Sequence, residues 1–284
     1  MNNLLKSIFI SLFPLFALYV TIDTIMHLTE NGFSYNYIGR LITAGTIITL
    51  FAGIFIIKRA RTDANLRFYS LFVIIGFIVS FFLGGLLGNG DINGLSMSLV
   101  LVLAWFAYIK WYSVFNDRRG NKTLKVGKQL PEFLLEDLQG NEVSSTSFIG
   151  KPAIYLFYRG NWCPLCMAQI KEIAVQYKEL EKRGVNTILV SPQPHKYTRN
   201  LANKFDVGFT FLTDRANKVA KQLDIFTKTG IPAGFQVLGY DSDTVLPTVV
   251  ITDNTNKIIF ADLTDNYRVR PEPETFLKVI DELA

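Results

Sequence analysis

The 284-residue sequence contains only two cysteines and two histidines. Both cysteines, Cys163 and Cys166, belong to one Cys-Pro-Leu-Cys motif, so the sequence has no long-range disulfide with which to staple a small secreted fold. A structural zinc site usually takes four cysteine or histidine ligands, and that count would need both His27, from an apolar segment, and His195. We therefore predict no metal and no other cofactor.

Charged residues are also few, at 19% of the sequence, and they are unevenly distributed. Residues 1–115 contain long apolar runs, whereas residues 116–284 have the composition of an ordinary soluble domain. The net charge is +5, and much of the basic excess lies beside the apolar runs, as is typical of membrane proteins. We therefore expect a lipid bilayer, and no nucleic acid, among the partners.

Apolar segments near the length that a bilayer core requires, about 20 residues, occur four times in the first half. They cover residues 4–26, 37–57, 68–88 and 92–109. The first segment lacks a small-x-small cleavage site near its end, so we expect a retained helix rather than a signal peptide. The sequence thus predicts a four-helix transmembrane domain over residues 1–115, followed by a linker at residues 116–128.

The loops of this domain differ in charge. Lysine and arginine occur between the second and third segments and after the fourth, but are absent from residues 28–36 and 89–94. The positive-inside rule then predicts that both termini, and the second half of the chain, face the cytoplasm, with a bacterial inner membrane as the expected location. The thiol pool there is reducing.

The apolar half offers few groups for chemistry of its own. Asp23, His27 and Arg40 lie near the predicted outer ends of the first two segments, where they either face the polar interface or serve a function. No cysteine lies in any of the four segments, so these helices cannot relay electrons by dithiol exchange. They either bind a molecule such as a quinone or act as an anchor.

The two cysteines follow a six-residue apolar run, residues 153–158, which is typical of a buried strand. Pro164 suits the first position of a helix. Apolar residues then recur at helical spacing, and a second apolar run follows at residues 185–190. A Cys-x-x-Cys pair at the strand-to-helix turn of a β–α–β unit indicates a redox motif rather than a chance pair.

The position of this motif at the start of a helix predicts that its cysteine thiols are reactive. The positive end of a helix dipole favours thiolate over thiol, and such motifs have cysteine pKa values of roughly 3.5–7.5. Arg159 either stabilises a thiolate or lies over the sheet end at the surface, and Trp162 is expected to shield the site and pack on the fold. For His195 we favour a solvated loop position over a proton carrier.

Other elements can be placed along the second half. We expect a strand at residues 209–213, helices at 196–205, 215–224 and 273–283, and a hairpin from 246–252 and 257–262. Residues 225–245 hold several glycines and prolines and are predicted as a loop or insertion.

Several of these motifs together resemble a known family. Residues from about 126 to 284 are similar to the thioredoxin-fold superfamily, and within it to the peroxiredoxin-like branch (alkyl hydroperoxide reductase/thiol-specific antioxidant) that carries Cys-x-x-Cys. The resemblance rests on Gly127, Pro131 and Phe133, on the loop at 157–166, on Ser-Pro-Gln193, and on Tyr-Arg-Val-Arg-Pro-Glu272. It implies an α/β thioredoxin-like domain over residues 129–284, with a central mixed sheet flanked by helices. It also implies that Pro247 is a cis proline facing the cysteines, whereas the residues alone equally allow a trans proline at the start of a strand.

The sequence departs from the family pattern at the reactive site. By the resemblance, Cys166 takes the peroxidatic position, Cys163 replaces a threonine or serine, and Arg159 replaces a proline. The arginine of the family pattern would fall near Leu246, so we expect it to be missing. These groups would orient and polarise a peroxide, whereas dithiol exchange needs only the cysteines and the helix.

Two mechanisms therefore stay open. In thioredoxin-like exchange, an exposed Cys163 attacks a disulfide and Cys166 resolves the mixed disulfide. In peroxidase chemistry, Cys166 attacks a peroxide and its sulfenic acid condenses with Cys163. We predict a membrane-anchored thiol–disulfide oxidoreductase or peroxiredoxin-like antioxidant, with a disulfide-bearing protein or peroxide as substrate and a cellular thiol as reductant. A redox-sensing membrane module is the main alternative, and metal or haem delivery by the dithiol with His195 is a third.

Overall fold

The computed structural model describes residues 2–57, 59–87, 92–115, 118–205 and 207–282. The chain divides into two compact units, which are described separately. The first consists of Leu5–Lys58 and Thr62–Val114, and the second contains Phe115–Ala284 with the short segments Met1–Leu4 and Arg59–Arg61. Some predicted features fall outside the described residues. They are one lysine between the second and third apolar segments (Lys58), the end of the third segment, part of the connection at 89–94, the start of the linker, and the end of the last predicted helix (Leu283).

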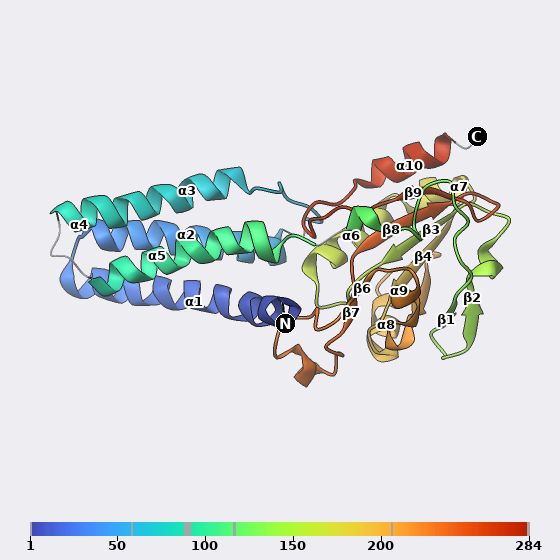
Figure 1. The fold of residues 1–284 in the computed structure, drawn as a ribbon, viewed down its shortest axis with the longest axis horizontal. Helices are drawn as coiled ribbons and strands as arrows, with labels where there is room; N and C mark the ends of the chain where they lie inside the picture. The colour runs from blue at the N-terminus through green and yellow to red at the C-terminus, as the bar shows by residue number, and fades with distance from the viewer. Residues whose placement is uncertain (1, 58, 88–91, 116–117, 206, 283–284) are drawn as a thin grey trace. The chain divides into compact units, whose positions relative to one another are not determined.

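The elements described in the first unit are all helices (Figure 1). Three of its helical runs are long and apolar enough to cross a membrane: α1 (Asn2–Asn31), α2 (Tyr35–Ile56), and α5 (Ile92–Ala107) extended by the π-helix η2 (Tyr108–Tyr112). The remaining run consists of α3 (Arg67–Ile78), the π-helix η1 (Val79–Leu83) and α4 (Gly84–Leu87). Its apolar part, Arg67–Leu83, is shorter than the other three. Four membrane spans therefore stay a prediction.

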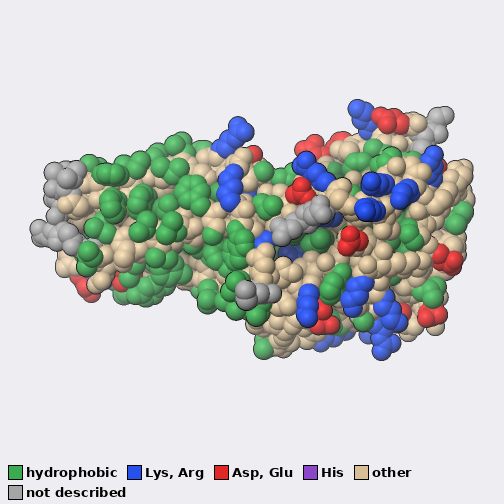
Figure 2. Space-filling view, viewed as in Figure 1, with side chains coloured by type: hydrophobic (Ala, Val, Ile, Leu, Met, Phe, Trp, Pro, Cys, Tyr) green, Lys and Arg blue, Asp and Glu red, His purple; other side chains and the backbone are tan. Residues whose placement is uncertain are grey.

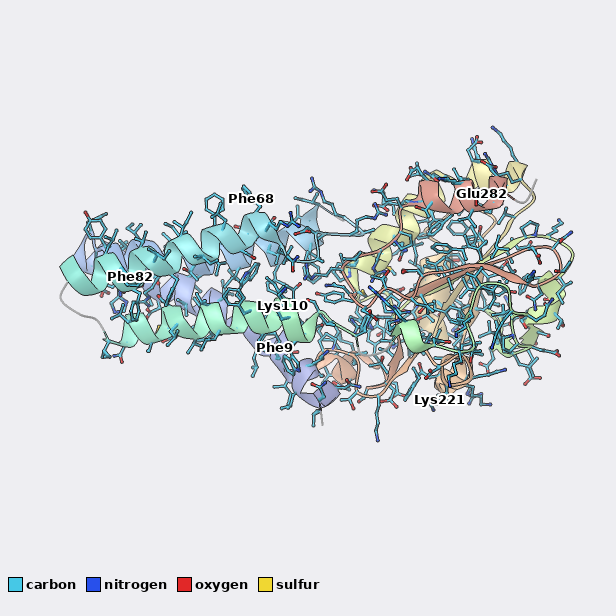
Figure 3. The ribbon with its side chains drawn as sticks, turned by 45° about the horizontal axis from the view of Figure 1, so that its top comes forward. Phe9, Phe68, Phe82, Lys110, Lys221 and Glu282 are labelled. Atoms are coloured by element: carbon cyan, nitrogen blue, oxygen red, sulfur yellow. The ribbon has the colours of Figure 1, made fainter. Side chains whose placement is uncertain are left out.

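Large apolar side chains cover the outside of this helical unit, and hydrophobic groups dominate its visible face (Figure 2). Phe68, which is 69% exposed, points away from the helices (Figure 3), and Phe82 is 53% exposed. An apolar surface of this extent is unusual for a soluble protein and suits contact with lipid.

Small and polar residues lie inside the same unit. A Cβ on Gly39 would lie 2.5 Å from the carbonyl oxygen of Gly76, so only glycine allows α2 and α3 to pack this closely. Arg40 is buried, donates to the Asp23 carboxylate, and lies 3.4 Å from the sulfur of Met97. The buried cation thus has a charged partner, as burial of an ion requires.

The second unit is built on a seven-stranded mixed sheet in the order β2-β1-β5-β4-β3-β8-β9. The strands are β1 (Leu134–Glu136), β2 (Glu142–Ser144), β3 (Ala153–Phe157), β4 (Asn186–Ser191), β5 (Thr210–Thr213), β8 (Thr248–Thr252) and β9 (Ile258–Ala261). The three central strands β3, β4 and β5 run parallel, and β8 pairs with β3 in the antiparallel direction. All five residues of β3 are buried, which explains its unbroken apolar sequence.

The helices of this unit are α6 (Pro164–Val175), α7 (Tyr177–Lys182), α8 (His195–Ala202), α9 (Lys218–Gln222) and α10 (Pro273–Asp281). The predicted helix after the cysteines is interrupted at Gln176, whose backbone leaves the α region (φ −93°, ψ 4°). The predicted insertion, residues 225–245, is framed by a two-stranded ribbon of β6 (Phe226–Thr227) and β7 (Thr244–Val245). The mixed sheet with flanking helices confirms the predicted thioredoxin-like class.

The segment predicted as a polar linker is largely packed into this unit, because its polar side chains bond to buried backbone groups. Asn121 donates to the carbonyl of Leu223 at 2.8 Å, and Leu124 joins the main hydrophobic core. Arg118, in the 3₁₀ turn η3 (Arg118–Gly120), donates to the carbonyl of Pro247 at 3.0 Å. The sequence did not predict this packing, because a polar composition is equally typical of an exposed linker.

Candidate functional site

The dithiol motif begins where the central strand ends. Phe157, the last residue of β3, pairs with Val190 of β4 on one side and Thr248 of β8 on the other. Tyr158 continues the ladder by donating its backbone N–H to the carbonyl of Val190 at 2.9 Å. The loop that leads to the cysteines therefore starts from three aligned strands, which fix its position.

Gln193 holds this loop in place from the end of β4. Its Oε1 accepts the backbone N–H of Asn161 at 2.9 Å, and its Nε2 donates to the hydroxyl of Tyr158 at 3.1 Å. Gly160 has φ +147°, and a Cβ there would lie 2.8 Å from Nε1 of Trp162, so glycine is needed for the tryptophan to fold back over the loop. The Ser-Pro-Gln193 motif thus supports the reactive loop.

The structure brings both predicted cysteines together at the start of α6. Cys163 is the N-cap residue and Cys166 lies in the first turn, as the position of Pro164 predicts. Both are reduced, and they are only 3% and 0% exposed. The expectation of an exposed Cys163 is therefore wrong. The insertion packs Phe235 against Trp162, the residue before Cys163.

Arg270 is a site residue that the sequence analysis missed. Its Nη1 and Nη2 each lie 3.6 Å from the sulfur of Cys166, and Nη1 also donates to Oε1 of Gln169 at 2.7 Å. Its Nε donates to the carbonyl of Tyr267 at 3.1 Å, so the loop between β9 and α10 holds the side chain rigidly. The position near Leu246 has no arginine, as expected, but Arg270 of the Tyr-Arg-Val-Arg-Pro-Glu272 motif places a guanidinium beside Cys166.

The surroundings of Cys166 favour its thiolate. Burial by itself would raise the pKa of this thiol, but a hydrogen bond from Cys163, the charge of Arg270 and the backbone N–H of Arg159 lower that pKa to about 5. The opposite holds for Cys163, because its hydrogen bond to Cys166, its burial and the neighbouring negative charge raise its pKa well above the ordinary value. The surroundings therefore favour the thiolate on Cys166 and the protonated thiol on Cys163.

Arg159 and Trp162 form the other side of the site. The Arg159 guanidinium lies over the Trp162 ring, 4.6 Å from its centroid, and donates to the carbonyl of Gly230 in the insertion. Its charge lowers the pKa of Cys163, but less than the Arg270 charge does. Both predicted supporting residues thus lie at the site, with Arg159 directed toward the insertion.

Pro247 lies directly before β8, at the sheet edge where the loop begins. No peptide bond in the described ranges is cis, so the cis proline expected from the resemblance is wrong. The residue stands at a strand start, where a missing backbone N–H is tolerated in the trans form. Its carbonyl oxygen accepts a hydrogen bond from Arg118.

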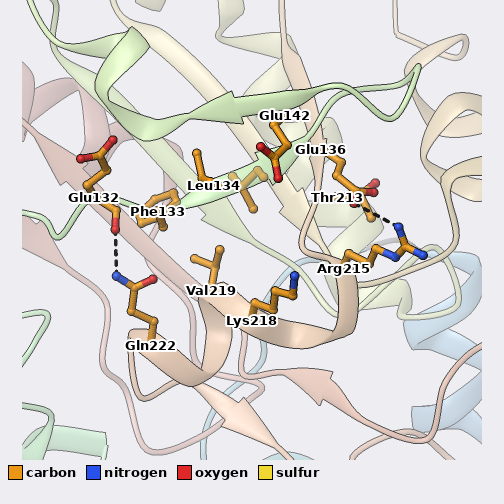
Figure 4. A pocket seen from close by; sticks show the side chains of 11 residues that line it. Glu132, Phe133, Leu134, Glu136, Glu142, Thr213, Arg215, Lys218, Val219 and Gln222 are labelled. Carbon is orange, nitrogen blue, oxygen red and sulfur yellow. Dashed lines mark hydrogen bonds and ion pairs between the residues drawn. The ribbon is translucent and has the colours of Figure 1, made fainter.

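His195 lies at the first residue of α8, with Nε2 3.1 Å from the Glu136 carboxylate of β1 rather than beside a cysteine. Within the described part of the chain, no three His, Cys, Asp or Glu residues are placed to share a metal ion. A pocket beside β1 contains Arg215, paired with Glu136, and Gln222, which donates to the carbonyl of Glu132 (Figure 4). Neither cysteine lines it.

Comparison with known proteins finds one matching family model and several similar sequences. The sequence model of the AhpC/TSA family matches residues 126–261. A chloroplastic peroxiredoxin Q from Sedum lineare is 32% identical over 96 residues, which are 34% of this chain and 52% of that relative. The thiol-disulfide oxidoreductase ResA of Bacillus subtilis is 28% identical over 140 residues, 49% of this chain and 74% of that relative.

The chain thus spans about half the length of the peroxiredoxin Q relatives that it matches. Among solved structures, the peroxidoxin BcpB from Mycobacterium tuberculosis is 17% identical. It matches 57% of this chain and 99% of its own, with a TM-score of 0.47.

Proposed function

We propose that this chain, whose residues 126–261 form a domain of the AhpC/TSA family, is a membrane-anchored, thiol-dependent oxidoreductase that reduces peroxides. The observation that carries the proposal is the Cys166 sulfur, held within 3.6 Å of both terminal nitrogens of Arg270. A buried thiolate paired with a fixed cation is a nucleophile that a small oxidant can reach more easily than a folded protein can.

The order of events follows from the two pKa shifts. The Cys166 thiolate attacks one peroxide oxygen, the O–O bond breaks, and the leaving oxygen takes up a proton to become water or an alcohol. Arg270 lies where it can stabilise the charge on the leaving oxygen. Cys166 is then a sulfenic acid. Cys163, which kept its proton, attacks the Cys166 sulfur, so a disulfide forms and water leaves.

The disulfide must be reduced before another turnover. Two electrons and two protons from a cellular dithiol, or from two thiols, restore Cys163 and Cys166 and leave the donor as a disulfide. Both cysteines are buried, so the reductant needs movement of the Trp162 side of the site. We expect hydrogen–deuterium exchange of residues 225–245 to rise in the oxidised protein.

Thiol–disulfide exchange with a protein substrate is the second candidate. It is favoured by Arg159 and Cys163, which stand where the peroxiredoxin pattern has a proline and a threonine or serine, and by the similarity to a thiol-disulfide oxidoreductase. A redox sensor, the third possibility, would change state once per redox shift and would not cycle with a reductant.

A peroxide assay on the full chain tests the proposal. We expect Cys166→Ser to abolish reaction with hydrogen peroxide, and Cys163→Ser to form one sulfenic acid at Cys166, which dimedone traps, without further turnover. Unimpaired peroxide turnover by Cys166→Ser would refute the assignment. Turnover of insulin disulfides at a higher rate than peroxide would favour the second candidate, and absence of cycling with either would favour the sensor.

Membrane anchoring and a cytoplasmic redox domain are also part of the proposal. Membrane anchoring is supported by three helices of sufficient length. The cytoplasmic side is supported by the lysine and arginine residues of two connecting segments, together with the even number of spans, four, that the sequence predicts. Because both native cysteines are buried, orientation is better probed with Ser147→Cys, an exposed position, in a chain lacking them. An impermeant maleimide should label it only after the inner membrane is opened; labelling of intact spheroplasts would reverse the orientation.

A further inference from the structure

Gln169 lies in the reactive helix α6, three residues after Cys166, and is only 2% exposed. Side chains at this spacing lie on the same face of a helix, with Cβ atoms about 5–6 Å apart. The Gln169 side chain also accepts a hydrogen bond, through Oε1, from the Arg270 nitrogen that lies 3.6 Å from the Cys166 sulfur. The amide therefore belongs to the buried surroundings of that sulfur.

The contact with Arg270 fixes which way this amide is oriented. An arginine side chain has donors and no acceptor, so only the amide oxygen of Gln169 can face it. The amide nitrogen, Nε2, is then directed away from the guanidinium. Within the described part of the chain, Nε2 is buried and has no hydrogen-bond partner. An unpaired buried donor costs free energy, and one that lies at a reactive site points to a group that it binds during the reaction.

The proposed chemistry supplies such a group. The reduced Cys166 sulfur is a weak acceptor, and both terminal nitrogens of Arg270 already lie 3.6 Å from it. Reaction with a peroxide places an oxygen atom on this sulfur, and oxygen is a stronger acceptor than sulfur. Thiol–disulfide exchange adds no oxygen. A spare donor beside Cys166 therefore suits reaction with peroxide better than exchange with a protein disulfide.

We propose that Gln169 is a catalytic residue whose Nε2 donates a hydrogen bond to the oxygen that Cys166 takes from a peroxide. This inference rests on the proposed peroxide reduction. As the S–O bond forms and the O–O bond breaks, the sulfur loses two electrons and the leaving oxygen takes up a proton. Gln169 then holds the transferred oxygen until the Cys163 thiol attacks the Cys166 sulfur. The disulfide forms, and the oxygen leaves as water with the thiol proton.

Gln176 provides a matched comparison on the same helix. It is the residue at the C-cap of α6, ten positions after Cys166, and its Oε1 is also buried without a partner among the described residues. Its Nε2 donates to the Glu274 carboxylate rather than to a group of the reactive site. An unpaired acceptor at that distance from the sulfur cannot bind the transferred oxygen, so Gln176→Met serves as the control.

Two variants separate the amide nitrogen of Gln169 from its amide oxygen. Gln169→Glu keeps an oxygen that accepts from Arg270 and replaces Nε2 by a second oxygen, whereas Gln169→Met has similar length and removes both contacts. In the full chain carrying Cys163→Ser, we expect each variant to form the Cys166 sulfenic acid with hydrogen peroxide about 10-fold more slowly. That loss corresponds to about one hydrogen bond in the transition state. The control should react at the unsubstituted rate.

The rates are compared on their plateau, at pH values well above the Cys166 pKa of each variant, so that a change in the thiolate fraction does not contribute. Quenched flow followed by mass spectrometry measures the remaining thiol. A second readout is over-oxidation, because a hydrogen bond to the sulfenic oxygen makes the sulfur less nucleophilic. Under a fixed excess of peroxide, the share of sulfinic acid should rise several-fold in both Gln169 variants and stay unchanged in Gln176→Met.

The outcomes distinguish the nitrogen from the oxygen of the amide. Recovery of the plateau rate in Gln169→Glu, with a loss only in Gln169→Met, would overturn the inference and leave Gln169 as a residue that positions Arg270. An equal loss in Gln176→Met would also overturn it, because the effect would then come from α6 as a whole. Failure of the chain with native Gln169 to form any sulfenic acid would instead overturn the proposed function.

Discussion

The two sides of the dithiol each contain an arginine, and the two arginines have different roles. On one side, Arg270 directs both terminal nitrogens at the Cys166 sulfur and is fixed by Gln169 and by a backbone carbonyl. On the other, Arg159 lies over Trp162 and donates to the insertion. Arg159 is four residues from Cys163 in the sequence, whereas Arg270 is more than a hundred residues from either cysteine.

The difference shows that electrostatic control of a site depends on where the guanidinium points. A buried thiolate requires a partner charge in direct contact, since water does not screen or solvate it. Arg270 provides that contact. Arg159 instead contributes its backbone N–H to Cys166 and uses its side chain to join the reactive loop to the insertion.

Replacing Arg270 is the strongest way to test this contrast. We expect Arg270→Met, which keeps the bulk and removes the charge, to reduce the rate with peroxide at pH 7 by about 100-fold. The Cys166 pKa should rise from about 5 toward the value of a free cysteine, about 8.5, because the charge of Arg270 and its hydrogen bond to the thiolate are lost. The absorbance of the thiolate at 240 nm, followed against pH in a Cys163→Ser background, measures this pKa.

The control for that variant is Arg119→Met. Arg119 is 83% exposed on its side chain and pairs with Asp265 at 3.0 Å, so its loss should leave both the rate and the Cys166 pKa unchanged. Equal effects of the two variants would mean that overall positive charge, rather than the contact with Cys166, lowers the pKa.

The pH dependence of the peroxide rate of the native chain should also show that Cys166, beside Arg270, is the attacking cysteine, although the effect is smaller. The attacking form is the Cys166 thiolate, and its pKa is about 5, so the rate with peroxide should be level near neutrality and half-maximal near pH 5. Below that it should fall about tenfold per pH unit, because protonation removes the nucleophile. A half-maximal point at pH 8 or above, measured by stopped-flow Trp fluorescence, would assign the attack to the other cysteine.

Replacing Arg159 should have the smallest effect on chemistry. We expect Arg159→Met to change the peroxide rate by less than about threefold, since its side-chain charge acts mainly on Cys163 and ranks below that of Arg270. Hydrogen–deuterium exchange in residues 225–245 should increase, because the bond to Gly230 is lost. A rate loss as large as that of Arg270→Met would remove the distinction between the two sides.

Much of the fold was predictable because local signals and burial agree. The apolar run at β3, Pro164 at the start of α6 and the second apolar run at β4 each specify their own element, and together they place Cys163 and Cys166 at the strand-to-helix turn. The lengths and regularity of the helices were less predictable. The amino-acid composition does not indicate the break at Gln176 or the π-helix at Val79–Leu83.

The missed features depend on contacts between distant segments. The position of Arg270 comes from the loop before α10 folding back over α6, and sequence spacing carries no information on that contact. Composition also does not reveal that Cys163 is buried, or that Phe235 of the insertion packs on the neighbouring Trp162. The resemblance to the Cys-x-x-Cys branch includes the motif around Arg270 but does not assign that arginine a role. The arginine pair at 268 and 270, directly before Pro271, is the only signal for it in the sequence.

The contacts of Arg118 determine where a fragment that contains only the second unit should begin. Its guanidinium supplies hydrogen bonds to the carbonyls of Pro247 and Thr264 and to the hydroxyl of Thr248. A soluble fragment starting at Gln129 would leave these buried acceptors without their donor, at a cost of about 1–3 kcal/mol for each unsatisfied group. It would also lack Leu124 from the core. Truncation should therefore be made near Phe115, immediately after the last apolar helix.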